Sequence, residues 1–255
     1  MKISIIQSDI IWSNPEENRR RMEEKLNTLP AADLYVFPEM FSTGFCTEPH
    51  QIAEEADKPG TLEWMQTTAQ KKQCALAGSV ATHAEGKYYN RFYFVYPDGS
   101  YHAYDKKHLF TYGGEHLTFT PGQERVVVTY KGVRILLQVC YDLRFPVWAR
   151  NRKDYDMILY VASWPETRIE AWNTLLHARA IENQCYVAGV NRVGTDPSCA
   201  YCGGSILIDP YGKTLAACKP NEEDAVSTLI DLEGLESFRK KFPVLNDADP
   251  FTLTP

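Results

Sequence analysis

Along the chain, short apolar runs alternate with longer segments in which apolar residues recur every three or four positions. The short runs predict β-strands and the longer segments predict amphipathic helices, a combination typical of α/β proteins. The expected strands cover residues 3–9, 33–37, 74–82, 88–96, 100–105, 125–130, 133–140, 157–163, 186–190, 205–209, 214–218 and 225–231. The expected helices begin after residue 14 and cover residues 61–73, 147–153 and 170–183.

Local signals support several of these boundaries. Asn14 has the character of an N-cap, Pro15 suits the first helical position, and Glu17 follows at the third position. The turn-forming sequences at residues 97–99 and 131–132 predict two hairpins in the middle of the chain.

No linker-like or low-complexity segment interrupts this pattern, so we expect one domain at residues 1–235. Residues 236–255 form a C-terminal extension. Its prolines Pro243, Pro250 and Pro255 predict extended chain that lies on the surface or contacts a partner.

The composition narrows the class of protein. The 255 residues are 44% hydrophobic and 24% charged, which is typical of a folded globular protein and excludes a disordered one. The net charge of −6 argues against nucleic acid as a partner, although a local basic patch stays possible on this ground alone. No apolar stretch reaches the roughly 18 residues of a membrane span. The seven scattered cysteines fit reduced thiols, so we expect a cytoplasmic protein.

Several sequence motifs that would indicate a particular chemistry are absent or incomplete. The sequence contains no G-x-G-x-x-G, H-E-x-x-H or G-x-S-x-G. Gly212-Lys213-Thr214 imitates the end of a phosphate-binding loop, but Leu207 stands where the first glycine is needed, and residues 209–212 are more simply a turn. Cys199 and Cys202 have zinc-knuckle spacing without a second pair of ligands. We therefore expect no metal and no organic cofactor.

Three apolar strands end next to chemically capable side chains, namely Glu39, Lys106 and Cys140. Ligand crevices of open α/β sheets lie outside the carboxyl ends of the strands, so these three side chains can converge on one pocket. Taken singly, each residue type at such a position is more often a solvated loop carboxylate, a surface charge or a small core residue. The spacing alone therefore leaves the catalytic interpretation open.

The sequence around these residues resembles a known family. Three segments are similar to the signature segments of the nitrilase, or carbon–nitrogen hydrolase, superfamily: Phe37-Pro38-Glu39, Tyr104-Asp105-Lys106-Lys107-His108-Leu109-Phe110 and Cys140-Tyr141-Asp142-Leu143-Arg144-Phe145-Pro146. Residues 162–165 and 178–184 resemble the omega-amidase branch, whose members hydrolyse the terminal amide of 2-oxoglutaramate and 2-oxosuccinamate. The resemblance implies a four-layer α-β-β-α sandwich and a homodimer.

The resemblance also implies roles for individual residues. Glu39 matches the general base, Lys106 the cation and Cys140 the nucleophile, and Glu115 matches a fourth family position. A thiol with an ordinary pKa of about 8.5 is mostly protonated at neutral pH, so a base must take its proton. Lys106 and the backbone N–H of Tyr141 are then expected to stabilise the tetrahedral oxyanion, and water hydrolyses the resulting thioester.

An omega-amidase substrate carries a carboxylate remote from the scissile amide, which calls for a cationic partner. Arg144 and Arg168 follow the Cys140 strand and the Trp164 strand, and Trp164, Phe110 and Tyr112 are candidates for apolar walls. Surface ion pairs explain the two arginines equally well, and aromatic residues are more often part of a core.

Other functions stay open at this point. An N-carbamoyl amino acid hydrolase and a nitrilase belong to the same superfamily, although nitrilases tend to carry Trp-Glu after the cysteine where this chain has Tyr141-Asp142. A catalytically silent interaction subunit is the alternative from another class, and the presence of all four candidate residues argues against it. A nucleotide-binding α/β protein is disfavoured by the missing glycine fingerprint.

Overall fold

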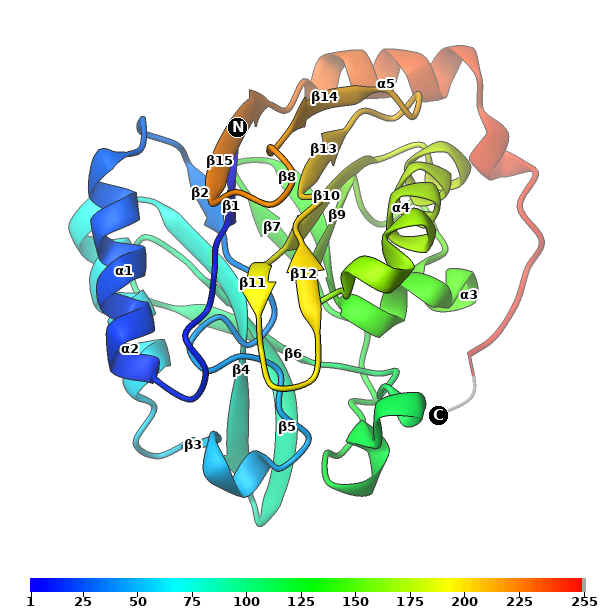
Figure 1. Cartoon of the computed structure of the whole chain (residues 1–255). Helices are drawn as coiled ribbons and strands as arrows, with labels where there is room; N and C mark the ends of the chain where they lie inside the picture. Colours follow the sequence, from blue (N-terminus) through cyan, green and yellow to red (C-terminus); the bar gives the residue numbers. More distant parts are fainter. Residues whose placement is uncertain (254–255) are drawn as a thin grey trace.

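The computed structural model describes residues 1–253, which form two β-sheets stacked face to face with helices on both outer faces (Figure 1). The α-helices are α1 (Pro15–Thr28), α2 (Gly60–Lys72), α3 (Pro146–Ala149), α4 (Ile169–Asn183) and α5 (Leu232–Lys241). The strands are β1 (Lys2–Gln7), β2 (Leu34–Val36), β3 (Glu54–Glu55), β4 (Ala75–Ala84), β5 (Lys87–Val95), β6 (Tyr101–Asp105), β7 (Val127–Tyr130), β8 (Val133–Val139), β9 (Met157–Ala162), β10 (Tyr186–Asn191), β11 (Val193–Thr195), β12 (Ala200–Cys202), β13 (Ile206–Ile208), β14 (Thr214–Ala217) and β15 (Asp224–Leu229).

The two large sheets each have a parallel centre. The first sheet has the order β15-β1-β2-β4-β5-β6, with β3 also paired to β4, and β1, β2 and β4 run parallel. The second sheet has the order β14-β13-β10-β9-β8-β7, and β8, β9 and β10 run parallel. β11 and β12 form a separate antiparallel pair. The carboxyl ends of the parallel strands therefore meet at one edge of each sheet.

Successive side chains along each strand belong alternately to the core between the sheets and to an outer core. Ile5 of β1 and Leu137 of β8 belong to the core between the two sheets, whereas their neighbours Ile6 and Leu136 belong to the two outer cores. Successive strand residues point to opposite faces, so both faces of each sheet must be covered. α1 and α2 pack on the outer face of the first sheet and α4 on that of the second, which confirms the expected four-layer α-β-β-α sandwich.

The helices bury the faces that their sequences predict. The Asn14 side chain accepts the Glu17 N–H at 3.2 Å and caps α1, which begins at Pro15 as expected. In α4, Trp172 and Leu176 lie one turn apart and are fully buried against the second sheet. The four-residue spacing places these side chains on one face of the helix.

The expected elements are present, with two kinds of difference. The short helix expected at residues 147–153 is only α3, because Arg150 leaves the helical conformation with ψ 127°. The elements β3, β11, β12 and α5 were not predicted from the sequence. The turn at Asp209–Gly212 is confirmed, with Gly212 at φ 80° donating its N–H to the Asp209 carbonyl at 2.9 Å.

The expected C-terminal extension, residues 236–255, begins inside α5, so its first six residues are helical and not extended. Residues 242–253 continue after α5, and Pro255 lies outside the described residues. The Arg152 guanidinium lies 4.9 Å from the centroid of the Phe251 ring, and Leu253 contacts the intersheet core as a partly buried residue. None of the helices in residues 1–253 combines the length and the apolar character that a bilayer crossing requires.

A glycine on β4 lets the segment after β2 approach this strand closely. A Cβ atom on Gly78 would lie 2.9 Å from Cδ1 of Phe41 and 3.1 Å from Cβ of Phe37. Backbone N–H groups of the same two phenylalanines donate to β4 carbonyls at 2.7 and 3.3 Å. Residues 37–41, with Glu39 in their middle, therefore pack directly against the backbone of β4 at Gly78.

We expect Gly78→Ala to destabilise the protein by about 1–3 kcal/mol, because the added methyl group overlaps two packed aromatic residues. Thermal unfolding followed by circular dichroism measures this as a fall in Tm of roughly 2–10 °C. Gly60→Ala is the matched control, because its nearest neighbour, an Arg19 guanidinium nitrogen, lies 3.5 Å from the added Cβ. Equal melting temperatures for Gly78→Ala and the wild type would contradict the packing argument.

Candidate active site

Cys140 occupies a sharp turn at the carboxyl end of β8. Its φ of 45° lies in the left-handed region that non-glycine residues rarely adopt, and a short 3₁₀ helix, Cys140–Arg144, begins at the same residue. Such strain is kept only where the surrounding structure enforces it, and it is frequent at functional sites. Here the Asp142 carboxylate accepts the Val139 N–H at 2.9 Å and closes the turn around the cysteine.

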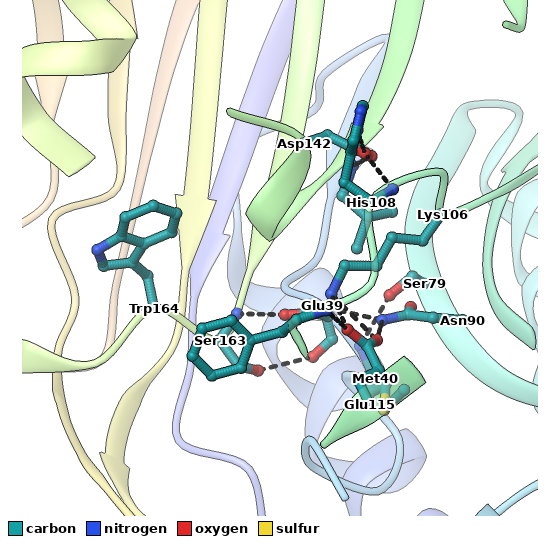
Figure 2. Close-up of polar contacts among 12 residues, drawn as sticks. Glu39, Met40, Ser79, Asn90, Lys106, His108, Glu115, Asp142, Ser163 and Trp164 are labelled. Carbon is teal, nitrogen blue, oxygen red and sulfur yellow. Dashed lines mark hydrogen bonds and ion pairs between the residues drawn. The ribbon is translucent and has the colours of Figure 1, made fainter. Parts of the chain in front are cut away.

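A buried ion cluster lies beside this turn (Figure 2). The Lys106 ammonium lies 3.0 Å from Oε1 of Glu39 and 2.9 and 3.1 Å from the two carboxylate oxygens of Glu115. The side-chain exposure is 1% for Lys106 and 0% for both glutamates. Desolvating these charges is costly unless they are paired and hydrogen-bonded, as they are here.

Neutral donors complete the coordination of the two carboxylates. The Asn90 side-chain amide donates to Glu39 at 2.7 Å and to Glu115 at 3.3 Å. The second oxygen of Glu39 accepts the Ser163 N–H at 2.8 Å, and the second oxygen of Glu115 accepts the Phe110 N–H at 2.6 Å. Residues from both sheets thus converge on the two glutamates (Figure 2).

The environment determines the protonation of the cluster. Burial by itself would lower the pKa of Lys106, but the carboxylates of Glu115 and Glu39 outweigh burial and raise it, so the ammonium is charged. Burial raises the pKa of Glu115, against the opposing charge of Lys106. Desolvation raises the pKa of the Cys140 thiol well above its ordinary value, and the charge of Glu39 raises it further. At neutral pH the cysteine is therefore a protonated thiol beside the Glu39 side chain.

Asp142 connects the cysteine turn to the lysine strand. Besides the Val139 N–H, its carboxylate accepts the Tyr104 hydroxyl at 2.7 Å and the His108 N–H at 3.0 Å, and it contacts the His108 ring nitrogen Nδ1 at 2.7 Å. Tyr104 and His108 lie on either side of Lys106 in the sequence. One buried carboxylate therefore fixes the segments that carry the sulfur and the ammonium relative to each other.

Glu39, Lys106 and Cys140 line one cavity of about 480 Å³, although they are far apart in the sequence. Tyr141 also lines the cavity, and it is the second residue of the 3₁₀ helix, where backbone N–H groups have no partner within the helix. Glu115 lies behind Lys106 and outside the cavity lining, so it contacts the lysine from the protein side.

The residues expected at the substrate end line the same cavity: Arg144, Arg168, Trp164, Phe110 and Tyr112. The Arg144 guanidinium lies 4.9 Å from the centroid of the Trp164 ring, and the Arg168 guanidinium lies 5.2 Å from that of Phe110. Neither arginine forms a salt bridge with a carboxylate of residues 1–253, which leaves both cations available at the cavity. Trp164 is buried, whereas Tyr112 is 87% exposed.

The sequence did not single out three side chains of the site: Asn90, Ser163 and Asp142. Asp142 and Ser163 stand inside segments that carry the family resemblance, so their position was a usable signal. Asn90 lies on β5 within an ordinary strand pattern, and only the fold brings it to the glutamates.

Another part of the cavity lining was also not foreseen. It includes Phe45 and Cys46 of the loop after β2, and Pro197, Ser198 and Cys199 of the loop between β11 and β12. Cys199 precedes β12, Cys202 ends it, and both are free cysteines. In residues 1–253, no three His, Cys, Asp or Glu side chains are grouped to hold a metal ion.

Comparisons with known proteins agree with this geometry. A profile described as "Carbon-nitrogen hydrolase" matches residues 2–240. Omega-amidase YafV of Escherichia coli K12 is 43% identical over 254 residues, which cover 99% of this chain and 98% of that protein. The 2-oxoglutaramate amidase of Bacillus subtilis is 36% identical over 252 residues, which cover 96% of each chain.

Solved structures are similar over the full length. XC1258 from Xanthomonas campestris, described as a CN-hydrolase superfamily protein with an arsenic adduct in the active site, has a TM-score of 0.96 and 42% identity and covers 100% of this chain and 99% of its own. Nit3 of Saccharomyces cerevisiae, from branch 10 of the nitrilase superfamily, has a TM-score of 0.83 and 26% identity and covers 95% of both chains. This chain therefore belongs to the carbon–nitrogen hydrolase family of the nitrilase superfamily, as its three sequence segments predicted.

Proposed function

We propose that this protein is an omega-amidase that hydrolyses the terminal amide of small omega-amido 2-oxo acids, such as 2-oxoglutaramate and 2-oxosuccinamate, to the dicarboxylate and ammonia. The observation that carries the proposal is the opening of Glu39, Lys106 and Cys140 into one cavity with two arginines that have no carboxylate partner among the described residues. The similarity to relatives named omega-amidase and 2-oxoglutaramate amidase supports the same substrate class.

In the proposed first step, the Cys140 sulfur attacks the amide carbonyl while Glu39 takes the thiol proton. The raised pKa of the thiol keeps the proton on sulfur until the carbonyl is in place, so that proton transfer accompanies attack. The oxygen of the tetrahedral adduct becomes negative. Lys106 and the Tyr141 N–H, both at the cavity surface, are the donors that stabilise it.

Collapse of the adduct then breaks the C–N bond. Glu39 returns its proton to the nitrogen, ammonia leaves, and the acyl group stays on Cys140 as a thioester. Glu39 next takes a proton from water, whose attack on the thioester releases the carboxylic acid and restores the thiol. The proposed role of Glu115 is to hold the Lys106 ammonium in place through its two contacts of 2.9 and 3.1 Å.

Within the cavity, we assign the substrate carboxylate to Arg144 and Arg168. A guanidinium without a carboxylate partner in the protein gains most from an incoming carboxylate. Trp164 and Phe110 form the apolar part of this region and pack beside the carbon chain of the substrate, whereas Tyr112 also lines the cavity but is largely exposed to solvent.

Three further expectations belong to the proposal. We propose a homodimer, with residues 236–255 contributing to its interface beside the domain at residues 1–235. We also propose a cytoplasmic location, which agrees with seven cysteines that are all free thiols.

Initial rates of ammonia release test the substrate assignment. We expect the purified protein to release ammonia from 2-oxoglutaramate with a kcat/KM at least about tenfold above that for an aliphatic nitrile or an N-carbamoyl amino acid. The nitrile has no carboxylate for the cationic end, and the carbamoyl carbonyl, bonded to two nitrogens, is a weaker electrophile than the amide carbonyl of the ketoamide. If the ketoamide is the poorest of the three substrates, another branch of the superfamily is the correct assignment. If no amide is hydrolysed, the chain is a silent interaction subunit.

Replacing the arginines separates binding from chemistry. We expect Arg144→Leu and Arg168→Leu each to lower kcat/KM for 2-oxoglutaramate by about 10- to 100-fold, chiefly through KM, because each change removes a charge-assisted contact. For butyramide, which lacks the carboxylate, we expect each variant to lower kcat/KM by less than about threefold. Arg152→Leu is the matched control, since Arg152 lies over Phe251 and outside the cavity lining. Equal losses with both substrates would refute the carboxylate assignment.

A further inference from the structure

Within residues 1–253, the Asn90 amide is the one neutral side chain that bridges the two buried carboxylates. It lies next to the end of β6, and its own carbonyl accepts the Lys106 N–H at 3.0 Å. Its side-chain nitrogen donates to Oε1 of Glu39 at 2.7 Å and to Oε1 of Glu115 at 3.3 Å (Figure 2). Asn90 is completely buried, so no solvent molecule takes over either hydrogen bond.

The charges of the cluster do not balance, and the hydrogen bonds from Asn90 compensate for part of this imbalance. Glu39 and Glu115 supply two negative charges and Lys106 supplies one positive charge, and the two carboxylates contact the same ammonium. Two buried carboxylates in such proximity tend to share a proton, which raises the pKa of one of them. A base that already holds a proton cannot take another from Cys140.

The orientation of the Asn90 amide is informative. Its Oδ1 atom has no hydrogen-bond partner within residues 1–253, although it is buried. Rotating the amide would place this oxygen where the nitrogen now lies, 2.7 Å from a carboxylate oxygen. An unpaired buried acceptor is unfavourable, but an acceptor pressed against a carboxylate is worse, so the contacts require the N–H groups to face the glutamates.

We propose that Asn90 is a positioning residue that keeps Glu39 ionised and aligned for proton transfer by donating one N–H to each of the two glutamates. The inference rests on the proposed function of the site as a hydrolase that uses Glu39 as its base. Besides Asn90, the groups that face Glu39 are the Lys106 ammonium, the Ser163 N–H and the Cys140 thiol, and Glu115 is the nearest second carboxylate. Among the described residues, only Asn90 donates to both carboxylates without adding charge.

The pH dependence of kcat/KM tests the proposal. The acid limb of this profile reports protonation of the essential base in the free enzyme. A hydrogen bond to a carboxylate favours its ionised form, so its loss raises the proton affinity of Glu39. We expect Asn90→Leu to shift the acid limb to higher pH by about one unit or more, and to lower kcat at the plateau by roughly 100-fold.

Asn90→Asp keeps the size of the side chain and decides the question if the leucine variant does not fold. It replaces the donor with a third carboxylate, so we expect the acid limb to move upward again. The matched control is Asn18→Asp, at a buried asparagine that bonds to the backbone of Ile11 and Ser42. This control is expected to melt earlier than the wild type with an unchanged acid limb.

An acid limb at the wild-type position in folded Asn90→Leu or Asn90→Asp would overturn the proposal and leave Asn90 a packing residue. A shifted limb in the Asn18 control would overturn it as well, because the shift would then report general destabilisation. The result does not depend on the identity of the substrate, since any amide that the wild type hydrolyses gives the profile. Failure of 2-oxoglutaramate as a substrate would therefore affect the proposed function and not this inference.

Discussion

The structure depends on one constraint: a lysine ammonium with almost no exposure must be neutralised by carboxylates from other parts of the chain. Lys106 contacts Glu39 and Glu115 at 2.9–3.1 Å, and neither glutamate reaches solvent. Well-packed hydrophobic residues usually stabilise a fold as well as a buried ion cluster does, so such a cluster is poor evidence for a stabilising role. The two stacked sheets instead serve to bring these charges to the cavity that contains Cys140.

The surrounding structure explains how this arrangement is held. Gly78 lets the segment that carries Glu39 lie against β4, and Asp142 links the turn at Cys140 to the segment after β6 that carries Lys106. The positive φ of Cys140 indicates that the backbone conformation at this residue serves to position the sulfur. The thiol stays protonated because desolvation and Glu39 raise its pKa, so the base and the nucleophile are a coupled pair.

The local part of this arrangement was predictable from the sequence, because short apolar runs predicted most elements. Glu39, Lys106 and Cys140 follow strand ends, but this spacing left their roles open, and the resemblance of three segments to the carbon–nitrogen hydrolase superfamily indicated those roles. Three features were not predictable for physical reasons. Asn90 sits in an ordinary strand pattern and acquires its contacts only through pairing with distant segments. α5 contains Gly234 and a serine, which weaken its helical signal, and the short strands β11 and β12 are stabilised mainly by pairing with each other.

The most direct measurement is the mass of the protein quenched with acid during turnover of 2-oxoglutaramate, followed by peptide mapping. The account predicts that the intact mass rises by one acyl group and that this increment lies on the peptide that contains Cys140. Cys140→Ala should show neither the increment nor ammonia release, whereas Cys199→Ala, at another cysteine of the cavity lining, should retain both. Ammonia release by the Cys140→Ala variant, or an acyl group on another residue, would contradict the account.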